Sequence, residues 1–284
     1  FQSDPINSAL DSVAAVPAAA GGDTLVAEVA AKDTKQAELE KEEEEEDDSM
    51  RILCLHGYRQ TGSSFRQKTG AFRKLVKKTT NTFRTIRYDF IDAPHLVDSP
   101  SAADVDLSGV SNNSGLLCLT GGSAGTERAW WFSKPTGGFN ASEQSDWEHG
   151  LEESLKLVVA QLRKHAYDGL MGFSQGAAMA YIVLRHLENE EPSLLPKFAI
   201  LFAPFKSPCS GHNKYYDKRV DTPCMVVSGE VDKVIPREMT EALLPTFGQL
   251  SFFGHPAGHI VPAKAEHRTK YLSFINLFDK RPPR

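Results

Sequence analysis

The sequence predicts an α/β fold, in which helices cover both faces of a mostly parallel β-sheet. Three observations lead to this prediction. Short apolar runs end at glycines or polar turns, and they alternate with longer segments whose apolar residues recur at helical spacing. The hydrophobic share of 40% over 284 residues is also enough for a core of ordinary size. Strands that alternate with helices specify a parallel sheet, and we expect one such domain over residues 50–284.

Six short segments fit the strands of this sheet. Residues 51–55 (Arg-Ile-Leu-Cys-Leu) form a nearly unbroken apolar run that stops at His-Gly. Such a run is typical of a strand that is buried on both faces in a parallel sheet. The other five predicted strands are residues 85–91, 169–173, 198–202, 224–228 and 250–253.

Four longer segments fit helices, and they are residues 65–78, 146–165, 175–187 and about 263–278. In residues 146–165 leucines and valines recur every three or four positions, which is typical of an amphipathic helix. Residues 65–78 carry six basic side chains, which would also fit a nucleic-acid patch. No second basic stripe or interleaved aromatic pattern accompanies them, so we prefer a solvated helix face and expect no nucleic-acid partner.

Residues 1–49 differ in composition from the rest of the chain. They hold fourteen acidic residues against three lysines, a net charge of −11, whereas the whole chain carries −5. So polar a segment cannot offset the entropy lost on ordering, and we predict a disordered acidic tail. A docking tail for a basic partner is the alternative interpretation.

No run of about 18 apolar residues occurs, so a membrane-spanning helix is not expected. The apolar stretch at residues 13–20 is interrupted by Pro17 and lacks a basic region before it, which argues against a secretory signal. The expected compartment is the cytoplasm, with the nucleus as a second. Four cysteines without Cys-x-x-Cys spacing, at positions 54, 118, 209 and 224, fit reduced thiols in such a compartment.

Residues 97 to about 125 are rich in Ser, Gly, Asn and Asp and show little periodicity, so we expect an irregular insertion. An aromatic cluster, Trp130, Trp131 and Phe132, follows it. Trp130 and Trp131 could line an apolar substrate pocket. They could instead anchor the insertion to the domain, and we prefer this second interpretation.

The strongest motif is Gly-Phe-Ser-Gln-Gly at residues 172–176, which matches Gly-x-Ser-x-Gly between a predicted strand and a predicted helix. This context is that of a nucleophile elbow, where the glycines allow a sharp turn and the serine hydroxyl is exposed above the sheet. The helix that follows also favours negative charge near its first turn. Ser174 is therefore the candidate nucleophile, and a simple helix-capping serine is the alternative.

A serine hydroxyl needs a base, so the motif requires a carboxylate and a histidine further along the chain. After the strand at 224–228, Asp232 is the preferred acid and Glu230, in the same loop, is the alternative. After the last strand, His259 is the preferred base and His255 is the second choice. The order Ser, Asp, His supports the set more than any single residue does.

The tetrahedral intermediate of acyl transfer needs two N–H donors. We assign them to the backbone of Gln175, which follows the nucleophile, and to the backbone of Tyr58, which follows the first strand. His56 is predicted to orient that loop. The histidines show no metal-ligand spacing and the glycines form no phosphate loop, so neither a metal nor another cofactor is expected.

Six segments together resemble the family of serine hydrolases typified by the ovarian cancer-associated gene 2 esterase. They are LCLHGYRQ (53–60), KTG (68–70), FIDAPH (90–95), WWF (130–132), GFSQGA (172–177) and SGEVD (228–232). The resemblance runs from about residue 50 to about 278. It implies an α/β-hydrolase fold and a serine esterase of the cytoplasm or nucleus, with Ser174, Asp232 and His259 at the triad positions. Residues 98–127 lie where such proteins vary.

The expected activity is hydrolysis of alkyl or acyl esters of moderate to long chain, through a triad and an acyl-enzyme. The substrate would be a small-molecule or lipid-like ester. A thioesterase or lysophospholipase on the same scaffold is the nearer alternative, because a triad does not distinguish oxygen from sulfur leaving groups. A catalytically silent binding protein is the other. The physiological ester and the oligomeric state are left open, because the fold specifies neither and one fold hosts many functions.

Overall fold

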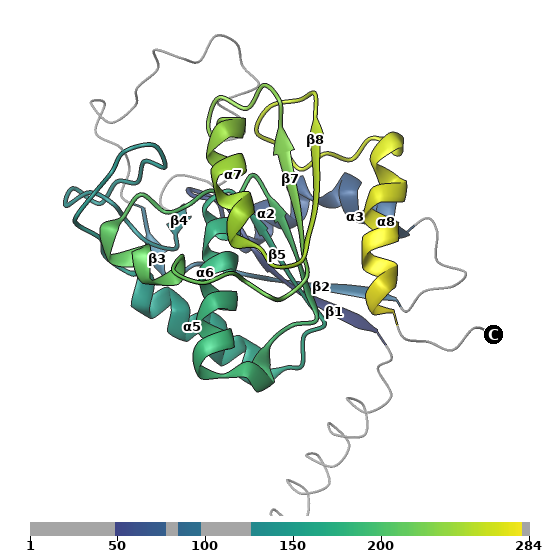
Figure 1. Ribbon diagram of the computed structural model, residues 1–284, viewed down its shortest axis with the longest axis horizontal. Coiled ribbons are helices and arrows are strands. Elements are labelled where there is room, and N and C mark those ends of the chain that lie inside the picture. The colour runs from purple at the N-terminus through teal and green to yellow at the C-terminus, as the bar shows by residue number, and fades with distance from the viewer. Residues whose placement is uncertain (1–48, 78–84, 98–125, 280–284) are drawn as a thin grey trace, which may run out of the picture. The chain divides into compact units, whose positions relative to one another are not determined.

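The computed structural model describes residues 49–77, 85–97 and 126–279. Its main sheet has six parallel strands in the order β2-β1-β5-β6-β7-β8 (Figure 1). The strands are β1 (Met50–Leu55), β2 (Ile86–Ile91), β5 (Gly169–Phe173), β6 (Phe198–Phe202), β7 (Cys224–Gly229) and β8 (Leu250–His255). Because all six run in one direction, their carboxyl ends lie along one edge of the sheet, which is where ligands bind in open α/β sheets.

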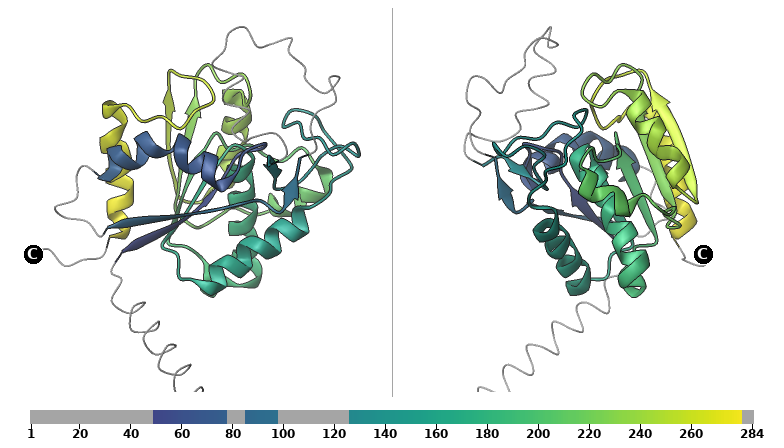
Figure 2. Two further views of the ribbon diagram at one scale, coloured as in Figure 1. Left: turned by 180° about the vertical axis from the view of Figure 1, so that it is seen from behind. Right: turned by 60° about the vertical axis from the view of Figure 1, so that its left-hand side comes forward.

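Helices cover both faces of this sheet, as Figure 2 shows from two further sides. On one face lie α2 (Gly62–Lys68), α3 (Gly70–Lys77) and α8 (Arg268–Ile275), and on the other lie α5 (Leu151–Lys164), α6 (Gln175–Glu190) and α7 (Arg237–Leu243). The predicted α/β-hydrolase architecture, a parallel sheet with helices on both faces, is thereby confirmed.

Alternation along the buried strands produces two separate hydrophobic cores. In β1, Leu53 and Leu55 face the core under α5 and α6, whereas Ile52 and Cys54 face the core under α2, α3 and α8. Successive side chains of a strand point to opposite faces, so a strand covered on both sides must be apolar throughout. The continuous apolar runs in the sequence have this cause.

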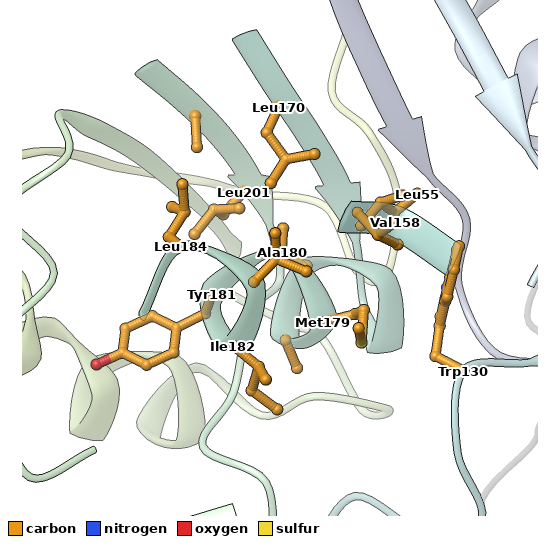
Figure 3. Packing of buried hydrophobic residues seen from close by; sticks show 14 of the residues in the cluster. Leu55, Trp130, Val158, Leu170, Met179, Ala180, Tyr181, Ile182, Leu184 and Leu201 are labelled. Carbon is orange, nitrogen blue, oxygen red and sulfur yellow. The ribbon is translucent and has the colours of Figure 1, made fainter. Parts of the chain in front are cut away.

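Helix α6 is the most deeply buried helix among the described residues, and Figure 3 shows its packing against the strands. Small side chains at Ala177, Ala178 and Ala180 let its axis approach the sheet, and all three are fully buried. Larger residues fill the space on either side, such as Tyr181 and Leu184. The helix that begins at the candidate nucleophile is thus fixed by close packing.

Three predicted helices differ from those in the structure. The helix predicted at 65–78 is two helices, α2 and α3, which meet at Thr69; the Thr69 hydroxyl donates to the carbonyl oxygen of Phe65 at 2.8 Å. The helix predicted from residue 146 begins only at Leu151, after Gly150 with a φ of 97°. At the C-terminal end, short 3₁₀ turns flank the eight residues of α8.

The sequence also gave no sign of two elements. A short antiparallel pair joins β3 (His95–Leu96) to β4 (Arg128–Ala129), and α7 follows the loop after β7.

The predicted disordered tail at 1–49, apart from its last residue, and the predicted insertion, apart from residue 97, lie outside the described residues. No helix in the described part of the chain is long and apolar enough to cross a membrane. Cys54, Cys209 and Cys224 are buried free thiols, and Cys118 is not described.

Candidate active site

Ser174 lies on a strained turn between the end of β5 and the start of α6. Its φ of 54° and ψ of −120° are unusual for a residue with a side chain. Its N–H donates to the carbonyl oxygen of Phe202 in the next strand at 2.9 Å, and its own carbonyl accepts from Ala177 and Ala178 at the start of the helix. Strain of this kind persists only where the surrounding structure enforces it.

Two glycines make this turn possible. A Cβ atom on Gly176 would overlap the carbonyl oxygens of Leu55 and His56, and one on Gly172 would overlap the backbone of Gly176. The backbone of α6 therefore touches the end of β1 directly. The close approach that the pentapeptide predicts is present, and it brings the loop after β1 beside Ser174.

Asp232 and His259 meet across two loops, one after β7 and one after β8. Oδ2 of Asp232 lies 2.7 Å from Nδ1 of His259, and Oδ1 accepts the N–H groups of Val234 and Ile235, both at 2.9 Å. The Asp232 side chain is 1% exposed and that of His259 8%. Gly229 allows the two loops to pack, because a Cβ there would lie 2.5 Å from the carbonyl oxygens of Ala257 and Gly258.

The imidazole of His259 also lies against the nucleophile turn. Its ring centroid is 4.5 Å from that of Phe173, the residue before Ser174. Ser174, Asp232 and His259 follow three strands of the same sheet, β5, β7 and β8, at their carboxyl ends. The fold thus brings together the three residues that the sequence order selected.

The two alternative residues are placed differently. Glu230 is exposed, and Gly254 is near its side chain. His255 is the last residue of β8 rather than part of the loop after it, and its Nδ1 lies 3.3 Å from the N–H of Ala257. Burial lowers the pKa of His255. The hydrogen bond between Asp232 and His259 favours these two over Glu230 and His255.

The loop after β1, which holds Tyr58, is fixed by a short stretch of strand-like pairing. Gln60 accepts the N–H of Arg128 at 3.1 Å, and Arg59 donates its N–H to the Arg128 carbonyl at 2.9 Å. Arg59 has a φ of 60°, and its side chain forms an ion pair with Glu127 at 2.5 Å. Gln175 begins α6, where the first N–H groups have no partner within the helix.

His56 has the orienting contacts that the sequence predicts for it. Its Nε2 accepts the N–H of Ala93 at 2.9 Å, and its Nδ1 lies 2.8 Å from the carbonyl oxygen of Gly57. Burial lowers the pKa of His56 to about 4. Because Nε2 must accept a hydrogen bond, the neutral ring with a proton on Nδ1 is the form that fits these contacts.

Trp130 and Trp131 are fully buried. The indole N–H of Trp130 donates to the carbonyl oxygen of His56 at 2.7 Å. The Gln175 side chain accepts the Trp130 N–H at 2.9 Å and donates to the Trp131 carbonyl at 2.8 Å. Of the two interpretations, these contacts favour the anchor over the pocket lining.

Phe139 packs against the loop after β1, a contact that the sequence pattern did not reveal. Its half-buried ring lies 5.3 Å from the ring of Tyr58 and 5.5 Å from that of Trp131, centroid to centroid. It lies in an irregular segment without periodicity. Only the preceding Gly137-Gly138 turn marked it, and a turn does not reveal a distant contact.

An α/β sheet with a serine at a strand-to-helix elbow and a histidine bound to a carboxylate defines the class of α/β hydrolases. The sequence pattern of the serine hydrolase (FSH1) family matches residues 46–271. Esterase OVCA2 of Danio rerio is 42% identical over 235 residues, covering 81% of this chain and 97% of the relative. Esterase OVCA2 of Homo sapiens is 34% identical over 236 residues, 81% of this chain and 96% of the relative.

The chain therefore belongs to the serine hydrolase (FSH1) family. The predicted family and the predicted enzyme class, a serine esterase, are confirmed. Solved structures agree on the fold: the Bacillus cereus carboxylesterase has a TM-score of 0.51 at 15% identity and covers 82% of this chain and 91% of its own. Esterase PE8 has the same TM-score at 19% identity, over 81% of this chain and 93% of its own.

Proposed function

We propose that this enzyme hydrolyses carboxylic esters through a Ser174, Asp232 and His259 triad and an acyl-enzyme. The observation that carries the proposal is the 2.7 Å contact between Asp232 and His259 at the sheet edge where Ser174 sits on its strained turn. The names of the relatives, which are esterases, support an ester substrate. The substrate class is a small-molecule or lipid-like ester with an alkyl or acyl chain of moderate to long length.

The mechanism follows from how each group is held. With its Nδ1–H donated to Asp232, His259 uses Nε2 as the basic nitrogen that takes the Ser174 proton. The Ser174 oxygen then attacks the ester carbonyl, and the resulting oxyanion accepts the N–H groups of Gln175 and Tyr58. His259 gives the proton to the leaving alcohol. Water then attacks the acyl-enzyme by the same route and releases the acid.

Apolar side chains beside the acid and base support a hydrocarbon substrate. Val231 and Val234 flank Asp232, and Ile260 follows His259; their exposed fractions are 62%, 38% and 46%. Exposed apolar side chains in the loops that carry the acid and the base fit an apolar ligand. Each buried methylene of a substrate adds about 0.8 kcal/mol of binding, so chain length should affect the rate.

The test is hydrolysis of p-nitrophenyl esters from acetate to dodecanoate by the full chain and by Ser174→Ala. We expect turnover that depends on chain length and a loss of about 10⁴-fold in the variant. Ser228→Ala is the matched control, because the buried Ser228 hydroxyl has no hydrogen-bond partner in the described part of the chain. Equal rates for wild type and Ser174→Ala would refute the triad.

A second measurement identifies the leaving atom. Rates on an ester and a thioester with the same acyl group should favour the ester if the carboxylic-ester assignment is correct. Faster thioester hydrolysis would move the proposal to a thioesterase with the same triad. No turnover of either, together with no labelling of Ser174 by a fluorophosphonate, would instead support a silent binding protein.

A further inference from the structure

We infer that Phe139 is the specificity-determining wall of the acyl pocket, whereas Val234 and Ile260 contact the alcohol group of the ester. This inference rests on the proposed function, since it concerns which part of an ester occupies which side of Ser174. It goes beyond that function by assigning the two sides to named residues. The position of the Phe139 ring and the direction in which the alcohol must leave support this assignment.

Phe139 lies between the loop after β1 and the loop after β6. Its ring packs on Tyr58, whose N–H is a proposed oxyanion donor, and its centroid is 5.9 Å from that of Phe205, shortly after β6. Both loops lie at the carboxyl edge of the sheet, on either side of β5, which ends at Ser174. Phe139 is half-buried, whereas Trp131 and Phe205 are fully buried.

The wall behind Phe139 is rigid. Trp131 meets the Phe139 ring edge-on, at an interplanar angle of 87°, and its own backbone is held by the Gln175 amide. The other side of Trp131 packs edge-on against the buried ring of His212. A half-buried aromatic ring supported by fully buried ones can limit the length and width of a bound chain, because the supporting core does not yield.

The chemistry of the leaving group separates the two sides. His259 must give a proton to the alcohol oxygen, so the alcohol lies on the His259 side of Ser174. Exposed apolar side chains beside His259 and Asp232 include Ile260, next to His259, and Val234, whose N–H donates to Asp232. Phe139, by contrast, packs between the loops after β1 and β6, on either side of β5, whereas His259 follows β8 at the edge of the sheet beyond β7. The acyl group is therefore the part that meets Phe139.

The experiment uses two ester series. In the first the acyl group grows from acetate to dodecanoate with p-nitrophenol as the constant alcohol, and in the second the alcohol grows from methyl to octyl with a constant butyryl group. Phe139→Ala should move the acyl optimum to longer chains, and Phe139→Trp should move it to shorter ones. The ratio of kcat/KM for dodecanoate to that for acetate should change about tenfold or more in opposite directions. The alcohol series should keep its shape in both variants.

Phe278→Ala is the matched control. Phe278 is also half-buried, but it stacks on Phe198 at the beginning of β6, the opposite end of the sheet from Ser174. We expect it to leave both series unchanged in shape. Opposite shifts for the Ala and Trp variants are the decisive result, because a structural role would lower all rates of both variants in parallel.

Three outcomes would overturn the inference in distinguishable ways. Parallel losses on all esters, or no change, would leave Phe139 as a packing residue while the esterase function stands. A change confined to the alcohol series would exchange the two sides. No ester hydrolysis by the wild type would remove the proposed function itself and the inference with it.

Discussion

The nucleophile turn and the acid–base loops are held in different ways. The turn at Ser174 is fixed by backbone contacts, between Gly172 and Gly176 within the turn and between α6 and the end of β1, and glycines make them possible. The loops of Asp232 and His259 are joined by a side-chain hydrogen bond between residues 27 positions apart, and Gly229 lets them pack. Both arrangements depend on neighbouring strands, β1 and β5 for the turn and β7 and β8 for the loops, but the turn has no space for an added side chain, whereas the acid and the base act through their side chains.

This difference teaches where each region tolerates change. Backbone contact leaves no room for an added atom, so the turn should fail through loss of the fold. A hydrogen-bonded pair at the edge of exposed loops should fail through loss of activity with the fold intact.

Asp232→Asn should lower kcat by about 10⁴-fold, because an amide no longer holds His259 in the tautomer that has its proton on Nδ1 and its basic nitrogen at Nε2. The melting temperature should stay close to that of the wild type. The matched control is Glu230→Gln in the same loop, and we expect kcat within about threefold of wild type. If Glu230→Gln lost activity while Asp232→Asn kept it, Glu230 would be the acid instead.

Gly176→Ala should destabilise the protein by about 4 kcal/mol or more, since its Cβ would overlap two carbonyl oxygens at the end of β1. A Gly→Ala change inside a helix normally stabilises by up to about 1 kcal/mol, so the sign itself is informative. Gly70→Ala is the control, because no atom lies within 4 Å of its added Cβ. Urea unfolding of both variants measures the difference, and equal stability would mean that helix and strand are not in contact.

Acidification should lower the stability of the protein through His56, which lies beside the Ser174 turn. Burial lowers the pKa of His56 to about 4, so below pH 6.5 the unfolded chain binds a proton that the folded ring does not. The free energy of unfolding should therefore fall as the pH drops, with His56 contributing about 2 to 3 kcal/mol between pH 7 and 4.5. His56→Gln should be less stable at pH 7 but should lose less stability on acidification. Denaturant titrations at both pH values provide the comparison, and equal acid losses would contradict it.

Ile260→Ser should have the smallest effect. The side chain is 46% exposed, so we expect a change in stability within about 0.5 kcal/mol. Activity on methyl butyrate should stay within about threefold, while octyl butyrate should lose more because its chain contacts this side of the site. A large loss of stability would show that the loops are held by packing and not by the hydrogen-bonded pair.

The elements that could be predicted from the sequence are those with a continuous local pattern. The buried strands lie within two residues of the predicted ends, because apolar runs stop where the sheet stops. Ser174 was identifiable from five residues, and chain order then led to Asp232 and His259 as the preferred acid and base, with Glu230 and His255 as alternatives. The break at Thr69 was missed because apolar spacing continues through it, as do the backbone hydrogen bonds from Thr69 to Phe65 and from Arg73 to Thr69. Phe139 was missed because its contacts are with distant segments.

Gln175 connects two parts of the site that are separate in the sequence. Its carboxamide is the same chemical group as a peptide unit. It accepts the backbone N–H of Trp130 and donates to the backbone carbonyl of Trp131, as the backbone of a neighbouring strand would. Glutamate, which has the same shape, would turn one of these two bonds into a repulsion between oxygens. Any residue that took the place of Gln175 would have to bond to both tryptophan backbones and also begin α6, so natural variation at this position should be narrow.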